Sequence, residues 1–183
     1  MEYRRQEQDA AEAELSRAEQ DLRSAVRLEA EEDERQAAQL ARRKRSLADV
    51  AFEAMSRGDR VAAGLGARTF TGRVVYSTGS LMTLEADGAT VDFNLEGPIQ
   101  LRVIESARSG GGSRADGPGS FRGRLLELEV YPDEIEVGSP LYADGLRGKI
   151  QVTAQDHLLV TDAAGSDWYL PLAWIGYVAR RHK

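Results

Sequence analysis

The chain has 183 residues, contains no cysteine and carries a formal net charge of −6. The absence of cysteine excludes disulfides, thiol nucleophiles and thiolate metal ligands, and it fits a cytoplasmic protein. The acidic balance disfavours a general nucleic-acid binder, because such proteins usually present a basic surface. We expect no membrane span, since no apolar run approaches about 18 residues, and no signal segment, since the first residues are charged. The abundance of alanine, glycine and arginine suggests a bacterial, GC-rich genome.

Residues 2–57 contain neither glycine nor proline and are dominated by strong helix formers, so this segment is predicted to be helical. Leucines and alanines recur at the spacing of a coiled-coil seam. We expect residues 1–45 to form a charged helix that either remains solvated or binds a protein partner or a second molecule. Its candidate interface residues are Leu15, Leu22 and Leu40.

A basic run, Arg42-Arg43-Lys44-Arg45, closes this helix. These four residues are candidate contacts to nucleic-acid phosphates. The alternative is that they balance the acidic residues 31–34 or are simply solvated.

Two short helices are predicted further along the chain. Ser46 can cap the N-terminus of the first helix, with Asp49 at the third helical position completing a capping box, and Gly58 would end the helix. A second short helix is predicted after Ser120. The apolar residues that follow Ser120 have helical spacing, although their alternation also permits a strand.

The sequence after each short helix is repeated. Residues 70–76 align with residues 146–152, and after a one-residue slip residues 80–95 align with residues 157–172. Both segments alternate apolar and polar residues, as half-buried strands do. A period of about 76 residues is the size of a small domain rather than of a solenoid repeat.

These patterns predict an α+β protein with a long N-terminal helix and two small five-stranded SH3-like barrels, each preceded by a short helix. Residues 1–45 would be the charged helix, 46–105 the first module and 120–183 the second module. Between them, residues 106–119 are rich in glycine and serine and are predicted to form a flexible linker. The alternative is one long loop in a single fused domain. We expect proteases to cut this linker near Arg108 or Arg114.

Residues 66–74 (GARTFTGRV) and 81–84 (LMTL) resemble the Sm-like (Hfq/LSm-type) family of small β-barrels. The turn glycine, the apolar residue and the strand glycine have the family's spacing. The resemblance covers roughly residues 46–104 and, more weakly, residues 120–178, and it implies two barrels of this type in tandem. The family's RNA-binding motif is not matched, because Thr83 stands where its base-binding asparagine would be.

No catalytic constellation is evident. The two histidines, His157 and His182, form no metal-binding pair, and the chain lacks a Gly-x-Ser-x-Gly motif. We therefore expect no catalytic residues, no cofactor and no metal site, and we predict that the protein is not an enzyme.

The favoured function is partner binding or assembly, through the N-terminal helix and the β modules. Tyr169 is a candidate interface residue, because it aligns with Asp92, a position expected to be exposed. The alternative is RNA or DNA binding of the Sm-like type, in post-transcriptional or transcriptional regulation. In that case Arg73 and Lys149 would join the basic run on phosphates.

Overall fold

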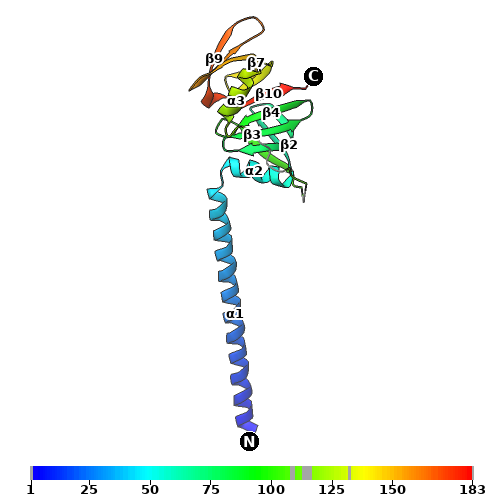
Figure 1. Cartoon of the computed structure of the whole chain (residues 1–183). Helices are drawn as coiled ribbons and strands as arrows, with labels where there is room; N and C mark the ends of the chain where they lie inside the picture. The colour runs from blue at the N-terminus through cyan, green and yellow to red at the C-terminus, as the bar shows by residue number, and fades with distance from the viewer. Residues whose placement is uncertain (1, 108–109, 113–116, 132, 183) are drawn as a thin grey trace. The chain divides into compact units, whose positions relative to one another are not determined.

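The computed structural model describes residues 2–107, 110–112, 117–131 and 133–182, with the side chains of residues 2–19, 21 and 25 left outside the description. The chain forms two units (Figure 1), residues 1–45 and residues 46–183. Among the described residues, no helix is both long enough and apolar enough to cross a membrane.

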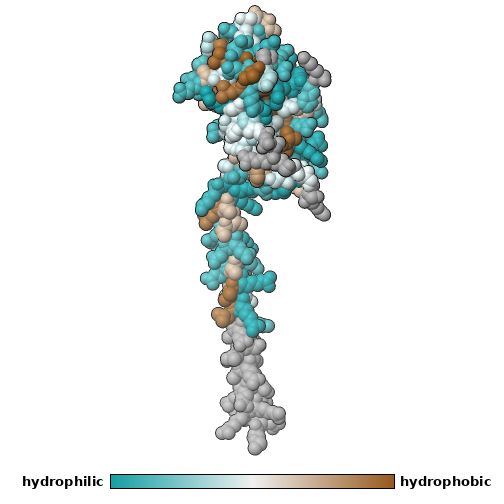
Figure 2. Space-filling model, viewed as in Figure 1, coloured by the Kyte–Doolittle hydropathy of each residue, from teal (hydrophilic) through white to brown (hydrophobic). Residues whose placement is uncertain are grey.

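The first unit is a single helix, α1 (Glu2–Lys44). Glu31 pairs with Arg27 at 3.2 Å and with Arg35 at 3.8 Å, one turn away on either side. Such pairs stabilise a helix that has few apolar contacts. Figure 2 shows only narrow brown patches along this helix among teal, hydrophilic surface.

The predicted coiled coil is wrong. In the part of α1 whose side chains are described, Leu22 and Leu40 are 67% and 55% exposed and form no coiled-coil seam. The physical reason is that α1 ends at Lys44, so Leu47 belongs to the next helix and the apolar seam is interrupted. The side chain of Leu15 lies outside the described residues.

The second unit begins with α2 (Leu47–Arg57), whose predicted capping box is confirmed. The Asp49 amide donates to Ser46 Oγ at 3.1 Å, and the Ser46 amide donates to an Asp49 carboxylate oxygen at 2.7 Å. Gly58 ends the helix in the left-handed conformation, with φ of 78°.

The segment after Ser120 is the helix α3 (Phe121–Val130), so the helical interpretation is confirmed over the strand. Ser120 Oγ accepts a hydrogen bond from the Gly123 amide at 3.1 Å, as an N-cap does. Helix α2 packs against the strands β2 (Arg68–Thr78) and β3 (Leu81–Ala86), whereas α3 packs mainly against β7 (Tyr142–Thr153).

The strands are β1 (Arg60–Leu65), β2 (Arg68–Thr78), β3 (Leu81–Ala86), β4 (Ala89–Asn94), β5 (Gln100–Glu105), β6 (Ile135–Ser139), β7 (Tyr142–Thr153), β8 (His157–Thr161), β9 (Asp167–Pro171) and β10 (Tyr177–Arg181), with a short 3₁₀ helix η1 (Leu172–Trp174) before β10. All of their pairings are antiparallel. They form one open sheet in the order β5-β1-β2-β3-β4-β10-β6-β7-β8-β9.

The predicted pair of closed five-stranded barrels is therefore wrong. β10 pairs with β6 on one side and with β4 on the other, which joins the two sets of strands into one sheet. Two separate barrels would require each set to close on itself. Instead, β5 and β9 are the two free edges of the described sheet.

The strand order nevertheless repeats. We call α2 with β1–β5 the first half, and α3 with β6–β10 the second half. The orders β5-β1-β2-β3-β4 and β10-β6-β7-β8-β9 correspond strand for strand. Gly72 and Gly148 occupy matching places in β2 and β7, and at each a Cβ atom would collide with the facing carbonyl oxygen, that of Glu85 or of Thr161.

The second half has one residue more than the first, and the structure places this insertion at a different point from the sequence alignment. Val74 and Ile150 match, and they face Leu84 and Val160 respectively. The strand β8 therefore aligns with β3 one residue earlier than predicted. The insertion is instead in the turn, where residues 163–165 replace residues 87–88 of the tight turn in the first half.

Two hydrophobic cores lie on the sheet. The first includes Met55 of α2 and Phe93 of β4, and the second includes Leu125 of α3. β10 contributes to both, because Tyr177 belongs to the first core and Val178 to the second.

The predicted cleavage sites Arg108 and Arg114 lie outside the described residues. On either side of them the chain is attached to the first half. The Ala107 amide donates to Asp59 Oδ1 at 2.8 Å, and the Tyr76 hydroxyl donates to the Pro118 carbonyl at 3.1 Å.

Candidate functional site: the junction between the halves

The two halves meet where β4 pairs with β10. Phe93 lies opposite Tyr177 in this ladder, and Asp92 lies opposite Val178. The Asn94 amide donates to the Gly176 carbonyl at 2.9 Å. Hydrogen-bonded pairs alternate in an antiparallel ladder, so every second residue of β4 presents its main chain to β10.

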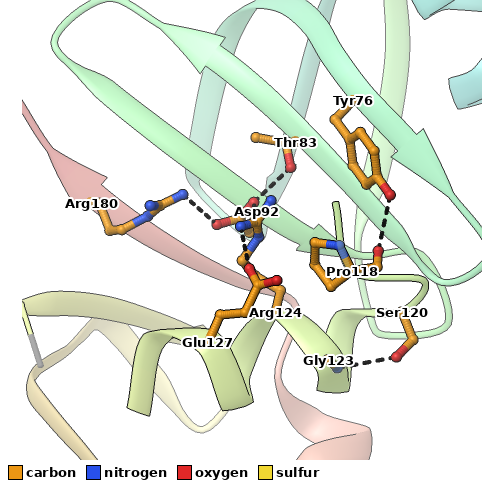
Figure 3. A network of polar contacts seen from close by, with 9 residues as sticks. All are labelled: Tyr76, Thr83, Asp92, Pro118, Ser120, Gly123, Arg124, Glu127 and Arg180. Carbon is orange, nitrogen blue, oxygen red and sulfur yellow. Dashed lines mark hydrogen bonds and ion pairs between the residues drawn. The ribbon is translucent and has the colours of Figure 1, made fainter. Parts of the chain in front are cut away.

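A buried ionic network crosses this junction (Figure 3). Asp92 is fully buried and accepts a hydrogen bond from the Thr83 hydroxyl at 2.7 Å. On the opposite side, Arg180 of β10 donates to Asp92 at 2.9 Å. Arg124 of α3 lies 3.4 Å from the same carboxylate and also pairs with Glu127 at 2.6 Å. One half thus supplies the carboxylate and the other half both arginines.

Substituting a single member of this network is expected to destabilise the junction. The Nε atoms of Arg124 and Arg180 are buried without a hydrogen-bond partner among the described atoms. Their guanidinium groups therefore depend on Asp92 and Glu127 for charge compensation. Removing one member of a buried ionic group leaves an uncompensated charge, which costs far more than the group contributes when intact.

The sequence interpretation missed this network. Asp92 was expected to be exposed, but it is completely buried. Alternation along β4 correctly places Val91 and Phe93 on the core face. It cannot reveal that α3, from the other half, covers the second face, since that contact joins residues far apart in the sequence.

Asp92 and the residues that contact it directly have counterparts in the opposite half, at the free edges β5 and β9, and these counterparts are apolar. Both short helices begin after a capping serine, and the strand residues that face Gly72 and Gly148, Val61 and Ile135, follow that serine at the same distance in sequence. Val50 therefore corresponds to Arg124. The ladders make Val103 the counterpart of Arg180, and Tyr169 the counterpart of Asp92.

A fourth position follows the same rule. Thr83 and Leu159 correspond, because they face Asp92 and Tyr169 in the matching ladders. Asp92 and its three direct partners, Thr83, Arg124 and Arg180, therefore have apolar counterparts, whereas Glu127 corresponds to Glu53 of α2. Two of these counterparts are accessible, since Tyr169 is 65% and Val103 36% exposed.

A second polar cluster surrounds Glu136 of β6, which is buried. Its carboxylate lies 3.1 Å from Arg68, 3.4 Å from Arg147 and 3.9 Å from Arg181. The Tyr177 hydroxyl donates to it at 3.2 Å. Burial and the nearby Glu136 charge raise the pKa of Tyr177 to about 12.

The Glu136 cluster lies in the wall of a cavity of about 770 Å³. Arg147, Lys149 and Arg181 contribute to its lining, together with the exposed acidic residues Asp133 and Glu134. Because three arginines share one buried carboxylate, the cluster retains unused guanidinium donors.

The candidate nucleic-acid residues belong to both units. Arg42, Arg43 and Lys44 lie in the last turn of α1, where positive charge is favourable to the helix dipole, and Arg45 follows it. Arg73 and Lys149 occupy corresponding positions in the two halves and line separate cavities. Of the six residues, only Lys149 lines the cavity beside Glu136.

Comparison with known proteins gives no match: neither a protein-family model nor a curated protein corresponds to this chain.

Proposed function

We propose that this protein is a non-catalytic assembly protein that binds a strand of a protein partner along the free edges β5 and β9. The observation that carries the proposal is the junction itself, where the fold already joins two such edges. The pairing of β4 with β10 is a strand addition between two repeated units. The outer strands β5 and β9 are the counterparts of β10 and β4, and neither has a partner on its outer side within the described sheet.

The free edge β5 is suited to receive a strand. Natural proteins usually protect an edge strand with proline, inward-pointing charge or a covering element. Between Gln100 and Glu105, β5 contains no proline and exposes Val103 and Ile104. Main-chain hydrogen bonds would supply affinity in this mode of binding, and side chains on alternate positions would supply specificity.

Synthetic peptides test this function. A fluorescent peptide of residues 175–182, which carries β10, is expected to bind the β9 edge, and one of residues 88–95, which carries β4, the β5 edge. Binding would be measured by fluorescence anisotropy on the full chain. Val103→Pro should weaken only the second peptide, because by correspondence with Arg180 the Val103 amide faces the free edge. If neither peptide binds better than a scrambled peptide, strand addition is not the function.

A second candidate function is polyanion binding at the Glu136 cluster, favoured by the three arginines on one carboxylate. A single-stranded oligonucleotide should then bind with an affinity that falls as salt rises, and Arg147→Ala combined with Lys149→Ala should flatten that slope by about two contacts. A comparison with alanines at residues 42–45 would separate this site from α1. The absence of binding at low salt would exclude this function.

A further inference from the structure

The free edges β5 and β9 match the two strands of the junction residue by residue, so the register of the junction can be applied to them. In the junction, Asp92 faces Val178 and Thr90 faces Arg180. Tyr169 and Asp167 are the counterparts of the two β4 residues, and Leu101 and Val103 are the counterparts of the two β10 residues. An edge-to-edge contact built like the junction would therefore place Tyr169 opposite Leu101, and Asp167 opposite Val103.

We propose that β9 of one molecule pairs in this register with β5 of a second molecule of the same chain. This inference rests on the proposed function and names its partner. The two edges are the two sides of a junction that the fold already contains once, so each presents the backbone direction that the other requires.

The coordinated change of side chains supports this partner over an unrelated strand. At the internal junction a carboxylate on one side meets two arginines on the other. At the free edges Tyr169 replaces the carboxylate, whereas Val50 and Val103 replace the arginines. The charged group has thus become apolar on both sides together, while Asp167, the counterpart of Thr90, stays polar at the rim of the contact. If the partner were an unrelated protein, the side chains of β5 and β9 would not need to be complementary to each other.

Apolar surface is present where the proposal requires it. Figure 2 shows brown surface among teal at the part of the second unit that Figure 1 labels β7 and β9. Tyr169 of β9 is 65% exposed, whereas its counterpart at the junction is fully buried. On the other edge, Val103 and Ile104 are 36% and 47% exposed.

The contact would be shorter than the internal junction. Pro171 corresponds to Asn94, whose amide donates across the junction to Gly176. Proline has no amide hydrogen, so this end of the ladder loses one hydrogen bond. We therefore expect association that depends on protein concentration rather than a permanent complex.

The association would be head-to-tail. Each molecule has one β9 edge and one β5 edge, and each edge binds only the other kind. Such a heterologous contact forms a ring when its rotation closes and a filament when it does not.

Sedimentation velocity of the full chain over a range of concentrations tests the proposal. The wild-type protein should exceed the monomer mass as concentration rises. Val103→Glu and Tyr169→Asp should each weaken association by about tenfold or more, because Val103→Glu would face Asp167 across the contact and Tyr169→Asp would place an unpaired charge in it. Matched controls are Val130→Glu and Tyr131→Asp, the same substitutions at positions that are 69% and 75% exposed on α3 and just after it.

A mixing experiment gives the sharpest result. A fluorescently labelled Tyr169→Asp molecule should be monomeric alone but should associate when mixed with the Val103→Arg molecule, since an arginine on one edge then meets a carboxylate on the other, as at the internal junction. A monomeric wild-type chain, or association that these edge variants do not change, overturns the inference. If the wild-type chain is monomeric while the strand peptides bind, the proposed function stands and only the second molecule is excluded as partner.

Discussion

Replacing Asp92 with alanine is expected to lower the free energy of unfolding by about 3–5 kcal/mol, the cost of leaving a buried charge without its partner. The value follows from the geometry, because Arg124 and Arg180 are partly buried and would lose their shared carboxylate while their Nε atoms remain out of contact with water. Guanidinium unfolding, followed by circular dichroism at one fixed protein concentration, measures the loss. Glu85→Ala is the control, since Glu85 is an exposed carboxylate on the neighbouring strand β3.

A compound variant separates the loss of charge compensation from the loss of contacts. Thr83→Leu, Asp92→Tyr, Arg124→Val and Arg180→Val together give the junction the side chains found at the corresponding free-edge positions. Apolar replacement of a complete buried ionic group is often neutral or stabilising, so this variant should unfold closer to wild type than Asp92→Ala does. A loss below about 1 kcal/mol for Asp92→Ala, the range of a surface ion pair, would refute the reasoning. So would a compound loss equal to the sum of the four single losses.

Three further predictions concern stability. The wild type should lose about 2 kcal/mol of unfolding free energy between pH 10 and pH 12, because the raised pKa of Tyr177 keeps this residue protonated in the folded state after it has ionised in the unfolded chain. Tyr177→Phe should remove this loss, as measured by unfolding titrations at each pH. Although burial raises the pKa of Asp59, hydrogen bonds from Arg57 and Ala107 and the Arg57 charge hold it below its ordinary value; stability present above about pH 4 should fall on acidification, and Asp59→Asn should flatten that fall in melting temperature. Gly72→Val and Gly148→Val should each lower the melting temperature, because a side chain at either position meets a facing carbonyl; two unchanged melts would contradict this.

Local features of the fold could be predicted from the sequence. The break before α2 and the start of α3 depend on capping serines, which act on amides within three residues. The repeated strands were also recognisable, because Gly72 and Gly148 are needed where two backbones approach closely. The position of the inserted residue was not, since Leu158-Leu159 is apolar in either register and the longer turn alone identifies the shift.

The joining of the halves was beyond sequence reasoning for a different reason. Whether β4 ends a closed barrel or continues into β10 depends on which distant strand completes its hydrogen bonds, and both choices suit the same alternating pattern. Asp92 was misplaced as a consequence, because its burial follows from that pairing. Among the predicted interface residues, Tyr169 lies on a free edge of the sheet. Its exposure was predicted from its alignment with Asp92, although Asp92 itself is buried.

The placement of β10 has a consequence for synthesis of the chain. This strand follows all the others in the sequence, yet it completes the ladders of both β4 and β6 and adds side chains to both cores. A nascent chain that has emerged only as far as β9 therefore exposes unpaired edges at β4 and β6, the kind of edge that recruits chaperones or other nascent chains. The long separation between Phe93 and Tyr177 also predicts slow folding, since contacts distant in sequence must form before either half is complete.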